Sequence, residues 1–338
     1  MRCLFLLFFI SSSLFSQEFK SDYFDYHNQI NKAENFYFIE KNVDSALFYY
    51  NKTFKEFDFI FVRDILTSIQ IASFENKPFD QYIFLGFSNG LKIEHLKSIP
   101  LVEKYYFKNK TNKKVIDLFK TNRDKYLKRI NVDYLDFIYN LSINDQIDKH
   151  KERKIYKGKI KYSITLIEKK IIQYGFPGEK LLGISDSTIF KDLNSNKLDF
   201  YARVKKIDRF NKVIGYFNLE EAEMCLKLPY LIFVHQFDSY SRYSDYWITE
   251  IKKGNVHPRV VGMLHDNTYR CSFCSTKKLK GYFGNNIFTT YHNNLWDIKK
   301  INKNRKSLYI NSFEVDLMKK EYETKHNFIF SYGLFHHR

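Results

Sequence analysis

Glycine, proline, cysteine and tryptophan are scarce in this chain, whose 338 residues include twelve glycines, five prolines, four cysteines and two tryptophans. With so few glycines and no phosphate-cradling glycine loop, we expect no nucleotide site. The zinc-protease motif H-E-x-x-H is also missing, and no catalytic signature names a reaction. After the amino terminus no segment reaches the roughly 18 consecutive apolar residues of a membrane-spanning helix. We therefore expect no transmembrane segment.

The amino terminus has the pattern of a secretory signal peptide. Met1 to Gln17 contains a basic residue, then a short apolar run and then small residues. Cleavage after Ser16 would leave a mature chain that begins at Gln17. Cys3 precedes the apolar run, whereas a lipid-anchoring cysteine would follow it, so we expect no lipid anchor. The sequence thus predicts a signal peptide over residues 1–16 and a secreted or periplasmic protein.

Basic residues exceed acidic residues, and the formal net charge is +17. Such an excess favours an anionic partner such as nucleic acid, polysaccharide or lipid headgroups. Lys, Asn, Ile, Phe and Tyr dominate the composition, however, and their A/T-rich codons give the same balance without selection for binding. The densest basic segment, Lys149 to Lys161, is interpreted as a solvated helix start, with binding of an anionic polymer as the alternative.

The amino-terminal part, residues 17–130, is predicted to form tetratricopeptide-like helical hairpins. Apolar residues recur at helical spacing from Tyr26 to Phe87 and predict four helices in two antiparallel pairs. Two similar segments, which begin at Asp44 and Asp80, stand 36 positions apart, close to the ~34-residue period of tetratricopeptide repeats. Stacked helices of this kind would offer a concave surface to a protein or peptide partner.

Residues 131–338 are predicted to form a second, mainly α-helical domain with some irregular or short β structure. Helices are expected over Lys113 to Arg129, over Val132 to His150, from Glu152 to Gly175 and from Tyr240 to Lys253. The helix from Glu152 to Gly175 has isoleucines at intervals of four, three and four residues, which is a single helical stripe. The least regular part is Phe190 to Phe217, where a hinge between domains is expected.

Eight short motifs are spread over most of the chain. They are A-E at Ala33, D-S-A-L-F-Y-Y at Asp44, R-D-I-L at Arg63, D-Q at Asp145, Y-G-F-P-G at Tyr174, H-Q at His235, K-K-G-N-V-H-P-R at Lys252 and H-D at His265. In this order they resemble an uncharacterised family of secreted bacterial proteins, in which tetratricopeptide-like helices precede an α-helical domain of unknown function. The chain departs from that pattern at Asn267, where an arginine would follow Asp266, and at L-K-G-Y-F-G from Leu279. The resemblance implies no known reaction.

Two histidines are candidate catalytic residues. His235 or His265 would act as a general base, supported by Asp238 or Asp266, which is the pairing that hydrolases use. His235 lies in a strongly apolar segment. A buried, hydrogen-bonded core histidine is therefore the interpretation that we set beside the catalytic one.

The cysteines allow several interpretations. Two residues separate Cys271 from Cys274, and Cys271 lies six residues after His265. These three residues are candidate zinc ligands, with Cys225, His257 or His292 completing a tetrahedron. Export favours a disulfide between Cys271 and Cys274 instead. Free thiols and a redox pair are the remaining alternatives, and apart from zinc the sequence implies no cofactor.

The function expected from these features is non-catalytic: a binding or scaffolding protein for a protein, peptide or envelope partner. The first alternative is a hydrolase-like or metal-dependent enzyme centred on His235, His265 and Asp266. The second alternative is a polyanion binder.

We predict that Cys271 and Cys274 are joined in the exported protein while Cys225 stays a free thiol, because export exposes the pair to oxidants. Thiol counting on denatured, non-reduced protein, together with elemental analysis, should find one free thiol and no metal. Three free thiols with about one equivalent of zinc would show a metal site of the mixed cysteine and histidine kind instead.

Overall fold

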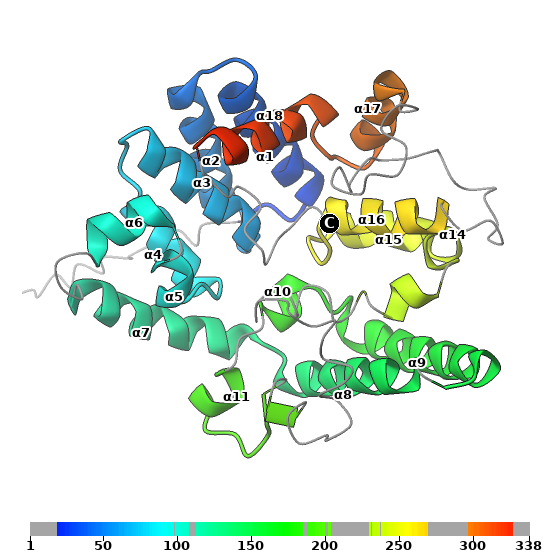
Figure 1. The fold of residues 1–338 in the computed structure, drawn as a ribbon. Coiled ribbons are helices and arrows are strands. Elements are labelled where there is room, and N and C mark those ends of the chain that lie inside the picture. The colour runs from blue at the N-terminus through cyan, green and yellow to red at the C-terminus, as the bar shows by residue number, and fades with distance from the viewer. Residues whose placement is uncertain are drawn as a thin grey trace, which may run out of the picture.

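Helices dominate the computed structural model (Figure 1), and none of the residues that it describes forms a strand. The described residues are 19–97, 99–107, 113–149, 151–184, 188–199, 202–203, 230, 232–236, 238–269 and 297–326. The predicted mainly α fold is therefore confirmed. The short β structure expected in the second domain is not seen in this part of the chain.

The early part of the chain is helical, as the apolar spacing predicted. They are α1 (Tyr23–Phe38), α2 (Val43–Glu56), α3 (Val62–Phe74), α4 (Asp80–Ser88), α5 (Ile93–Lys97) and α6 (Pro100–Tyr106). Asn42 caps α2, because its side chain accepts a hydrogen bond from the backbone N–H of Ser45 at 3.0 Å. Ala33 of α1 and Ala46 of α2 are fully buried, so two small residues let these helices approach closely.

The next helices are α7 (Lys113–Arg129), α8 (Val132–Asp148), α9 (Arg153–Tyr174), α10 (Glu179–Leu182) and α11 (Ile189–Asp192). The first three match the expected boundaries, whereas the two short helices α10 and α11 were not predicted. Asn131 caps α8 by accepting from the N–H of Tyr134 at 3.0 Å. Gly175, with φ of +93°, ends α9 in a conformation that glycine adopts without a steric cost. The observed and predicted boundaries agree because they depend on neighbouring residues: apolar residues at helical spacing lie between residues that cap the helix.

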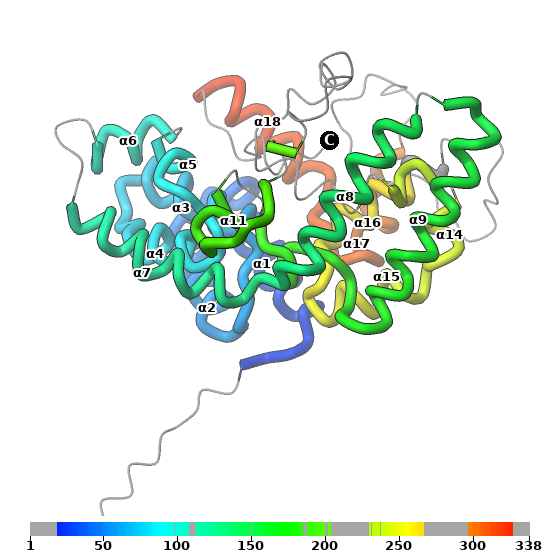
Figure 2. Tube along the Cα trace, turned by 90° about the horizontal axis from the view of Figure 1, so that it is seen from below, coloured from blue at the N-terminus to red at the C-terminus, as the bar shows by residue number. Residues whose placement is uncertain are grey.

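The last described helices return to the first. They are α14 (Ser239–Arg242), α15 (Ser244–Lys252), α16 (Pro258–Tyr269), α17 (Ile298–Ser307) and α18 (Phe313–His326). Helix α18 packs against α1, and the side-chain amide of Asn31 donates to the carbonyl of Tyr309 at 2.8 Å. Figure 2 shows α1 between the early helices on one side and α8, α9 and α14 to α16 on the other. Segments from both ends of the chain thus share one core.

One expected helix is divided. The sequence predicted a continuous helix from Tyr240 to Lys253, whereas α14 and α15 are separate. Tyr243 stands between them outside the helical region, with φ of −113° and ψ of +24°. Its hydroxyl donates to Glu168 of α9, and its ring packs against Trp247. These tertiary contacts fix Tyr243 at the division.

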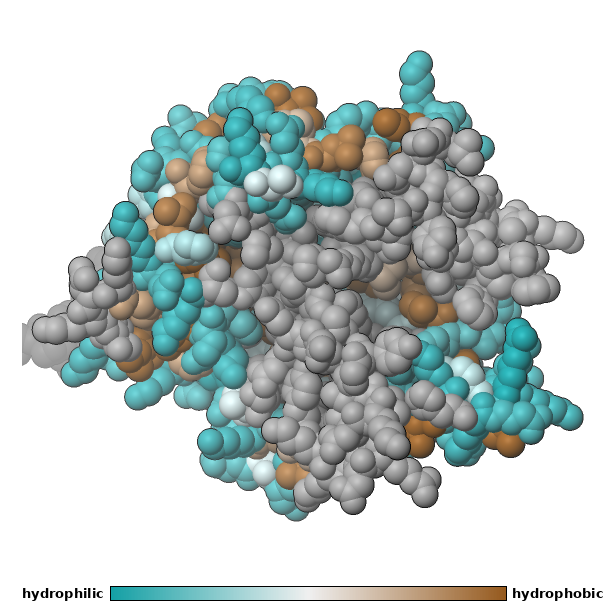
Figure 3. Space-filling model, viewed as in Figure 1, coloured by the Kyte–Doolittle hydropathy of each residue, from teal (hydrophilic) through white to brown (hydrophobic). Residues whose placement is uncertain are grey.

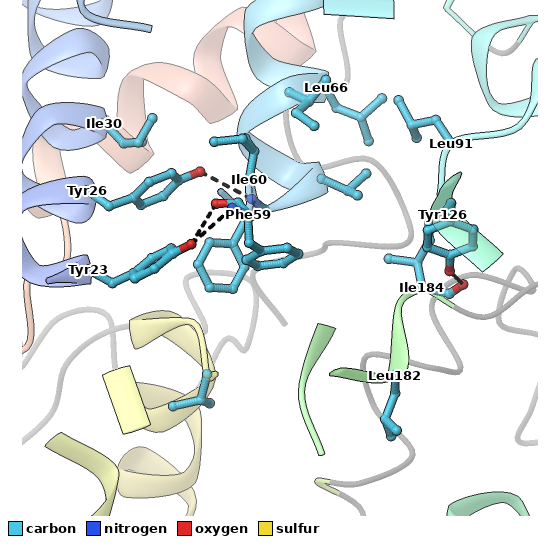
Figure 4. Close-up of a cluster of buried hydrophobic side chains, with 14 of the residues drawn as sticks. Tyr23, Tyr26, Ile30, Phe59, Ile60, Leu66, Leu91, Tyr126, Leu182 and Ile184 are labelled. Atoms are coloured by element: carbon cyan, nitrogen blue, oxygen red, sulfur yellow. Dashed lines mark hydrogen bonds between the residues drawn. The ribbon is translucent and has the colours of Figure 1, made fainter. Parts of the chain in front are cut away.

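Two tyrosines of α1 position the start of α3 (Figure 4). The Tyr23 hydroxyl accepts from the N–H of Phe59 at 3.1 Å and donates to Asp58 at 2.8 Å. The Tyr26 hydroxyl accepts from the N–H of Phe61 at 3.2 Å. Buried backbone N–H groups need such partners, and the tyrosines therefore hold the segment before α3 against α1.

The described surface in Figure 3 is mostly hydrophilic, with small separate apolar areas. Lys154, Lys157 and Lys161 of α9 are exposed, as expected for a solvated helix start. Ile172 on the same helix is 87% exposed. No helix in the described part of the chain combines the length and apolar character that crossing a membrane requires.

We predict opposite effects for two glycine-to-alanine changes. A Cβ at Gly178 would stand 1.8 Å from the backbone oxygen of Asn255, so Gly178→Ala should lower the free energy of unfolding by about 1–3 kcal/mol or more. Gly158, inside α9, has nothing within 4 Å of its Cβ position, so Gly158→Ala should raise it by about 0.5–1 kcal/mol. Urea unfolding of both variants measures the difference, and equal midpoints would contradict the packing at Gly178.

Candidate functional site

A pocket lies where α1 and α3 meet α16, α18 and the segment that leads into α18. It holds about 450 Å³ of empty space, part of which is open to solvent. Its lining consists of His27, Ile30, Asn31 and Glu34 of α1, Arg63, Asp64 and Thr67 of α3, His257 and Arg259 at the start of α16, and Tyr309, Ile310, Asn311 and Lys319. Apart from two isoleucines, these residues are polar or charged.

Most charges around this pocket are compensated in pairs. Arg259 forms two hydrogen bonds to the buried carboxylate of Asp316, at 2.6 and 2.7 Å. Arg305 of α17 donates to the same carboxylate. Glu34 accepts from Lys319 and from the amide of Asn311. Burying charged groups is costly unless they are paired and hydrogen-bonded, and these contacts meet that condition.

Arg63 is the exception. Among the described residues no carboxylate lies within ion-pair distance of its guanidinium, and its buried Nε has no hydrogen-bond partner. Burial lowers the pKa of Arg63, and the nearby positive charge of Arg259 lowers it further. An arginine still keeps its proton at neutral pH. The pocket therefore contains a partly buried positive charge that no anion of the described residues pairs.

Two neutral histidines stand beside Arg63. His27 is 2% exposed, and its Nε2 has no hydrogen-bond partner in the described structure. Burial, with a smaller effect from Arg63, lowers the pKa of His27 to about 3. Burial also holds the pKa of His257 well below its ordinary value, helped by Arg63 and His27. The two rings lie edge to face with centroids 5.1 Å apart.

The tautomer of His257 follows from its contact with the backbone. The N–H of Arg259 donates to Nδ1 of His257 at 3.2 Å. Because Nδ1 accepts and the ring is neutral, the proton must be on Nε2. His257 is thus a second donor in the pocket, beside the guanidinium of Arg63.

Asp64 is a carboxyl group whose charge is poorly accommodated. Its Oδ2 accepts from the hydroxyl of Tyr26 at 2.7 Å. Burial raises the pKa of Asp64 to about 7, and the negative charge of Glu34 adds to the effect. At neutral pH this carboxyl group is therefore partly protonated. The guanidinium of Arg63 and the Nε2–H of His257 are donors in this pocket, and a ligand that supplies oxyanion acceptors would satisfy them.

The sequence-predicted residues His235 and Asp238 lie elsewhere. His235 Nδ1 contacts Asp145 of α8 at 2.9 Å, and Tyr156 of α9 donates to the same carboxylate at 3.1 Å. Asp238 instead accepts from Gln236 at 2.6 Å and from Arg242 at 2.9 Å. His235 thus has the hydrogen-bonded environment expected of a core histidine, with Asp145 as the partner that the sequence analysis did not identify.

His265 and Asp266 are neighbours on α16. His265 is fully buried, with Nδ1 3.4 Å from an oxygen of Asp266 and its ring edge to face with Tyr240 at 4.5 Å. Within the described residues, no three His, Cys, Asp or Glu side chains form a group that could hold a metal ion. Cys225, Cys271, Cys274 and His292 lie outside the described residues, as do the disulfide and most of the zinc site predicted for them.

A serine motif was overlooked in the sequence. Gly86 to Gly90 reads G-F-S-N-G, which has the G-x-S-x-G spacing of a hydrolase nucleophile turn. In those enzymes the serine stands on a turn between a strand and a helix. Here Ser88 is the last residue of α4, and its hydroxyl donates to the carbonyl of Leu85 at 2.9 Å. The segment is a helix end and does not form a nucleophile turn.

Comparisons of this chain with protein-family models, with curated proteins and with solved structures found no match. The pocket residues therefore have to be judged by their own geometry. Several of them occur in the short motifs quoted above, namely Glu34 in A-E, Arg63 and Asp64 in R-D-I-L, and His257 and Arg259 at the end of K-K-G-N-V-H-P-R. Nothing in the sequence marks most of them as pocket residues, because a charged residue in a helix is usually exposed to solvent.

We predict that Lys319→Met destabilises the protein by about 3–5 kcal/mol, because it leaves the buried carboxylate of Glu34 without its cation. Adding Glu34→Gln should recover part of that loss. Lys325→Met, at an exposed position of the same helix, should stay within about 0.5 kcal/mol of the parent protein. Denaturant unfolding measures all three, and a silent Lys319→Met would contradict the buried pair.

Proposed function

We propose that this protein is a non-catalytic binding protein whose central pocket takes up an oxyanion, either a carboxylate or a phosphate-type group. One observation supports the proposal most strongly: Arg63 is a partly buried cation with a buried, unpartnered Nε and no paired acid among the described residues, in a pocket with open space. A guanidinium has five N–H donors in a planar fork that matches such anions. The ligand can be a small molecule or the charged end of a larger partner.

The unpaired donors also argue for binding on energetic grounds. Because Arg63 is only partly buried, solvent screens part of its charge, and its cost is smaller than that of a fully buried ion. An anion in the pocket would supply the partner that the guanidinium lacks. The neutral His257 adds a donor without adding charge, which favours an anion that accepts several hydrogen bonds.

The hydrolase alternative centred on His235, His265 and Asp266 draws less support. His235 contacts α8 and α9, whereas His265 contacts α14 and its own helix. Neither histidine lines the pocket. Catalysis by this pair would require that both reach one substrate.

We also propose that the early hairpins act as a tetratricopeptide-like surface for a protein or peptide partner and that the protein is exported. The packing of α1 on α2 and of α3 on α4 supports the first proposal. The residue pattern of the first 16 positions supports the second.

We predict that Arg63→Met abolishes anion binding and makes the ligand-free protein equally stable or more stable, because it removes a partly buried charge that has no paired acid among the described residues. Thermal unfolding with increasing inorganic phosphate, sulfate or acetate should stabilise the parent protein, by about 2.7 kcal/mol at 100 times the Kd. The Arg63→Met variant should show no such increase.

Arg153→Met is the matched control, since Arg153 is exposed at the start of α9. It should bind like the parent protein. If no anion stabilises the parent protein, or if Arg63→Met responds like Arg153→Met, the pocket is not an oxyanion site.

A further inference from the structure

The end of the hairpin that α8 and α9 form carries a dense group of positive charges. Helix α9 begins at Arg153, and its first acidic residue is Glu168. Before that residue the helix has five cationic side chains, all of them exposed: Arg153, Lys154, Lys157, Lys159 and Lys161. Figures 1 and 2 both place this end of the hairpin at the edge of the molecule. We call the first ten residues of α9, Arg153 to Tyr162, the basic tip.

The cations of the basic tip are not compensated by the part of the chain that the structure describes. No carboxylate there lies within ion-pair distance of any of the five, and the nearby Asp148 pairs with Lys151 at 2.5 Å instead. Glu152, the exposed N-cap residue, offsets one charge at most.

These cations do not stabilise α9. Positive charge near the start of a helix is unfavourable in the field of the helix dipole. Lys157 and Lys161 are four positions apart, so they are neighbours on the helix surface and repel each other. An anionic partner would relieve both effects.

Two large apolar side chains are exposed among the cations. Ile155 is 50% exposed and Tyr162 is 61% exposed. They are seven positions apart, which places them two turns from each other on the same face of the helix. Gly158 lies between them on that face, and a Cβ there would have nothing within 4 Å. Lys154 and Lys161 repeat the same spacing one position earlier and flank this apolar pair.

The combination of apolar and basic side chains favours a lipid surface over a soluble polymer. Helices that bind at a membrane surface place apolar side chains at the boundary of headgroups and acyl chains, while their lysines attract anionic lipids. Tyrosine is enriched at this depth because its ring is apolar and its hydroxyl is polar. A polysaccharide would bind the lysines but would leave Ile155 in water. Ile147, close to the end of α8, is a further exposed isoleucine at this end of the hairpin.

We infer that the basic tip docks the protein on an anionic lipid surface, with Ile155 and Tyr162 among the headgroups and the five cations against their negative charges. The contact is reversible, and salt weakens it because the attraction extends over about one Debye length. None of the residues of the basic tip lines the pocket. The lipid-binding surface is therefore independent of the proposed oxyanion site.

Co-sedimentation with lipid vesicles tests the inference. One set of vesicles contains phosphatidylglycerol and phosphatidylcholine in equal parts, and the other set contains phosphatidylcholine alone. The purified protein should sediment with the anionic vesicles much more than with the neutral ones. The bound fraction should fall as salt is added.

Lys154→Glu combined with Lys161→Glu removes the two cations that flank the apolar pair. Each basic residue near an anionic membrane contributes about fivefold to the affinity, so this double variant should bind anionic vesicles at least about thirtyfold more weakly than the parent protein. Both positions are exposed, and the thermal midpoint should therefore stay that of the parent protein.

Lys113→Glu combined with Lys120→Glu is the matched control. It makes the same change in charge at the same spacing on α7, where both lysines are exposed but no large apolar side chain is. This variant should bind anionic vesicles like the parent protein.

Tyr162→Ser distinguishes a lipid surface from a soluble polyanion. It keeps every charge, so it should bind heparin like the parent protein, whereas its affinity for anionic vesicles should fall several-fold.

Three results would overturn the inference. The first is equal sedimentation of the parent protein with anionic and neutral vesicles, or with neither. The second is the same loss of vesicle binding in the α7 control as in the Lys154 and Lys161 double variant. The third is vesicle binding by Tyr162→Ser that equals that of the parent protein, which would make the basic tip a site for soluble polyanions.

Discussion

The contact on which this structure depends most is the buried ion pair between Glu34 and Lys319, which joins the first described helix to the last. A carboxylate and an ammonium group removed from water are tolerated only if each satisfies the other. Asn311 adds a hydrogen bond to the same carboxylate, and Asn31 holds the segment that leads into α18. The position of α18 on α1 is therefore specified by polar contacts as well as by apolar packing.

Arg63 differs from the other cationic side chains of this core. Asp316 compensates both Arg259 and Arg305, and Glu34 compensates Lys319, whereas Arg63 has the half-protonated Asp64 beside it and no paired acid among the described residues. A core that served stability alone would replace such a group by an apolar one at little cost. A charge kept in a pocket with open space is typical of binding sites, where the ligand restores the stability that the unpaired charge costs the free protein.

The sequence predicted helix boundaries, which depend on neighbouring residues, and missed contacts between residues that are far apart in the chain. Helices α7, α8 and α9 lie where the apolar spacing and the caps at Asn131 and Gly175 placed them. The pocket is built from contacts such as the one between Glu34 and Lys319, which are 285 positions apart. The helical periodicity of the sequence does not show that two such distant residues are in contact. The same limit explains why His235 was paired with a near neighbour, whereas its partner is Asp145, 90 positions earlier.

The long separation of these partners also affects how the molecule forms during synthesis. The hairpin of α1 and α2 can close as soon as both helices have left the ribosome, but its Glu34 then has no cation until Lys319 follows. Until that point α1 and α3 expose Glu34 and Asp64 together, and their repulsion works against close packing of the two helices. Long-range contacts of this kind form late. The pocket is thus completed only after α18 has been synthesised.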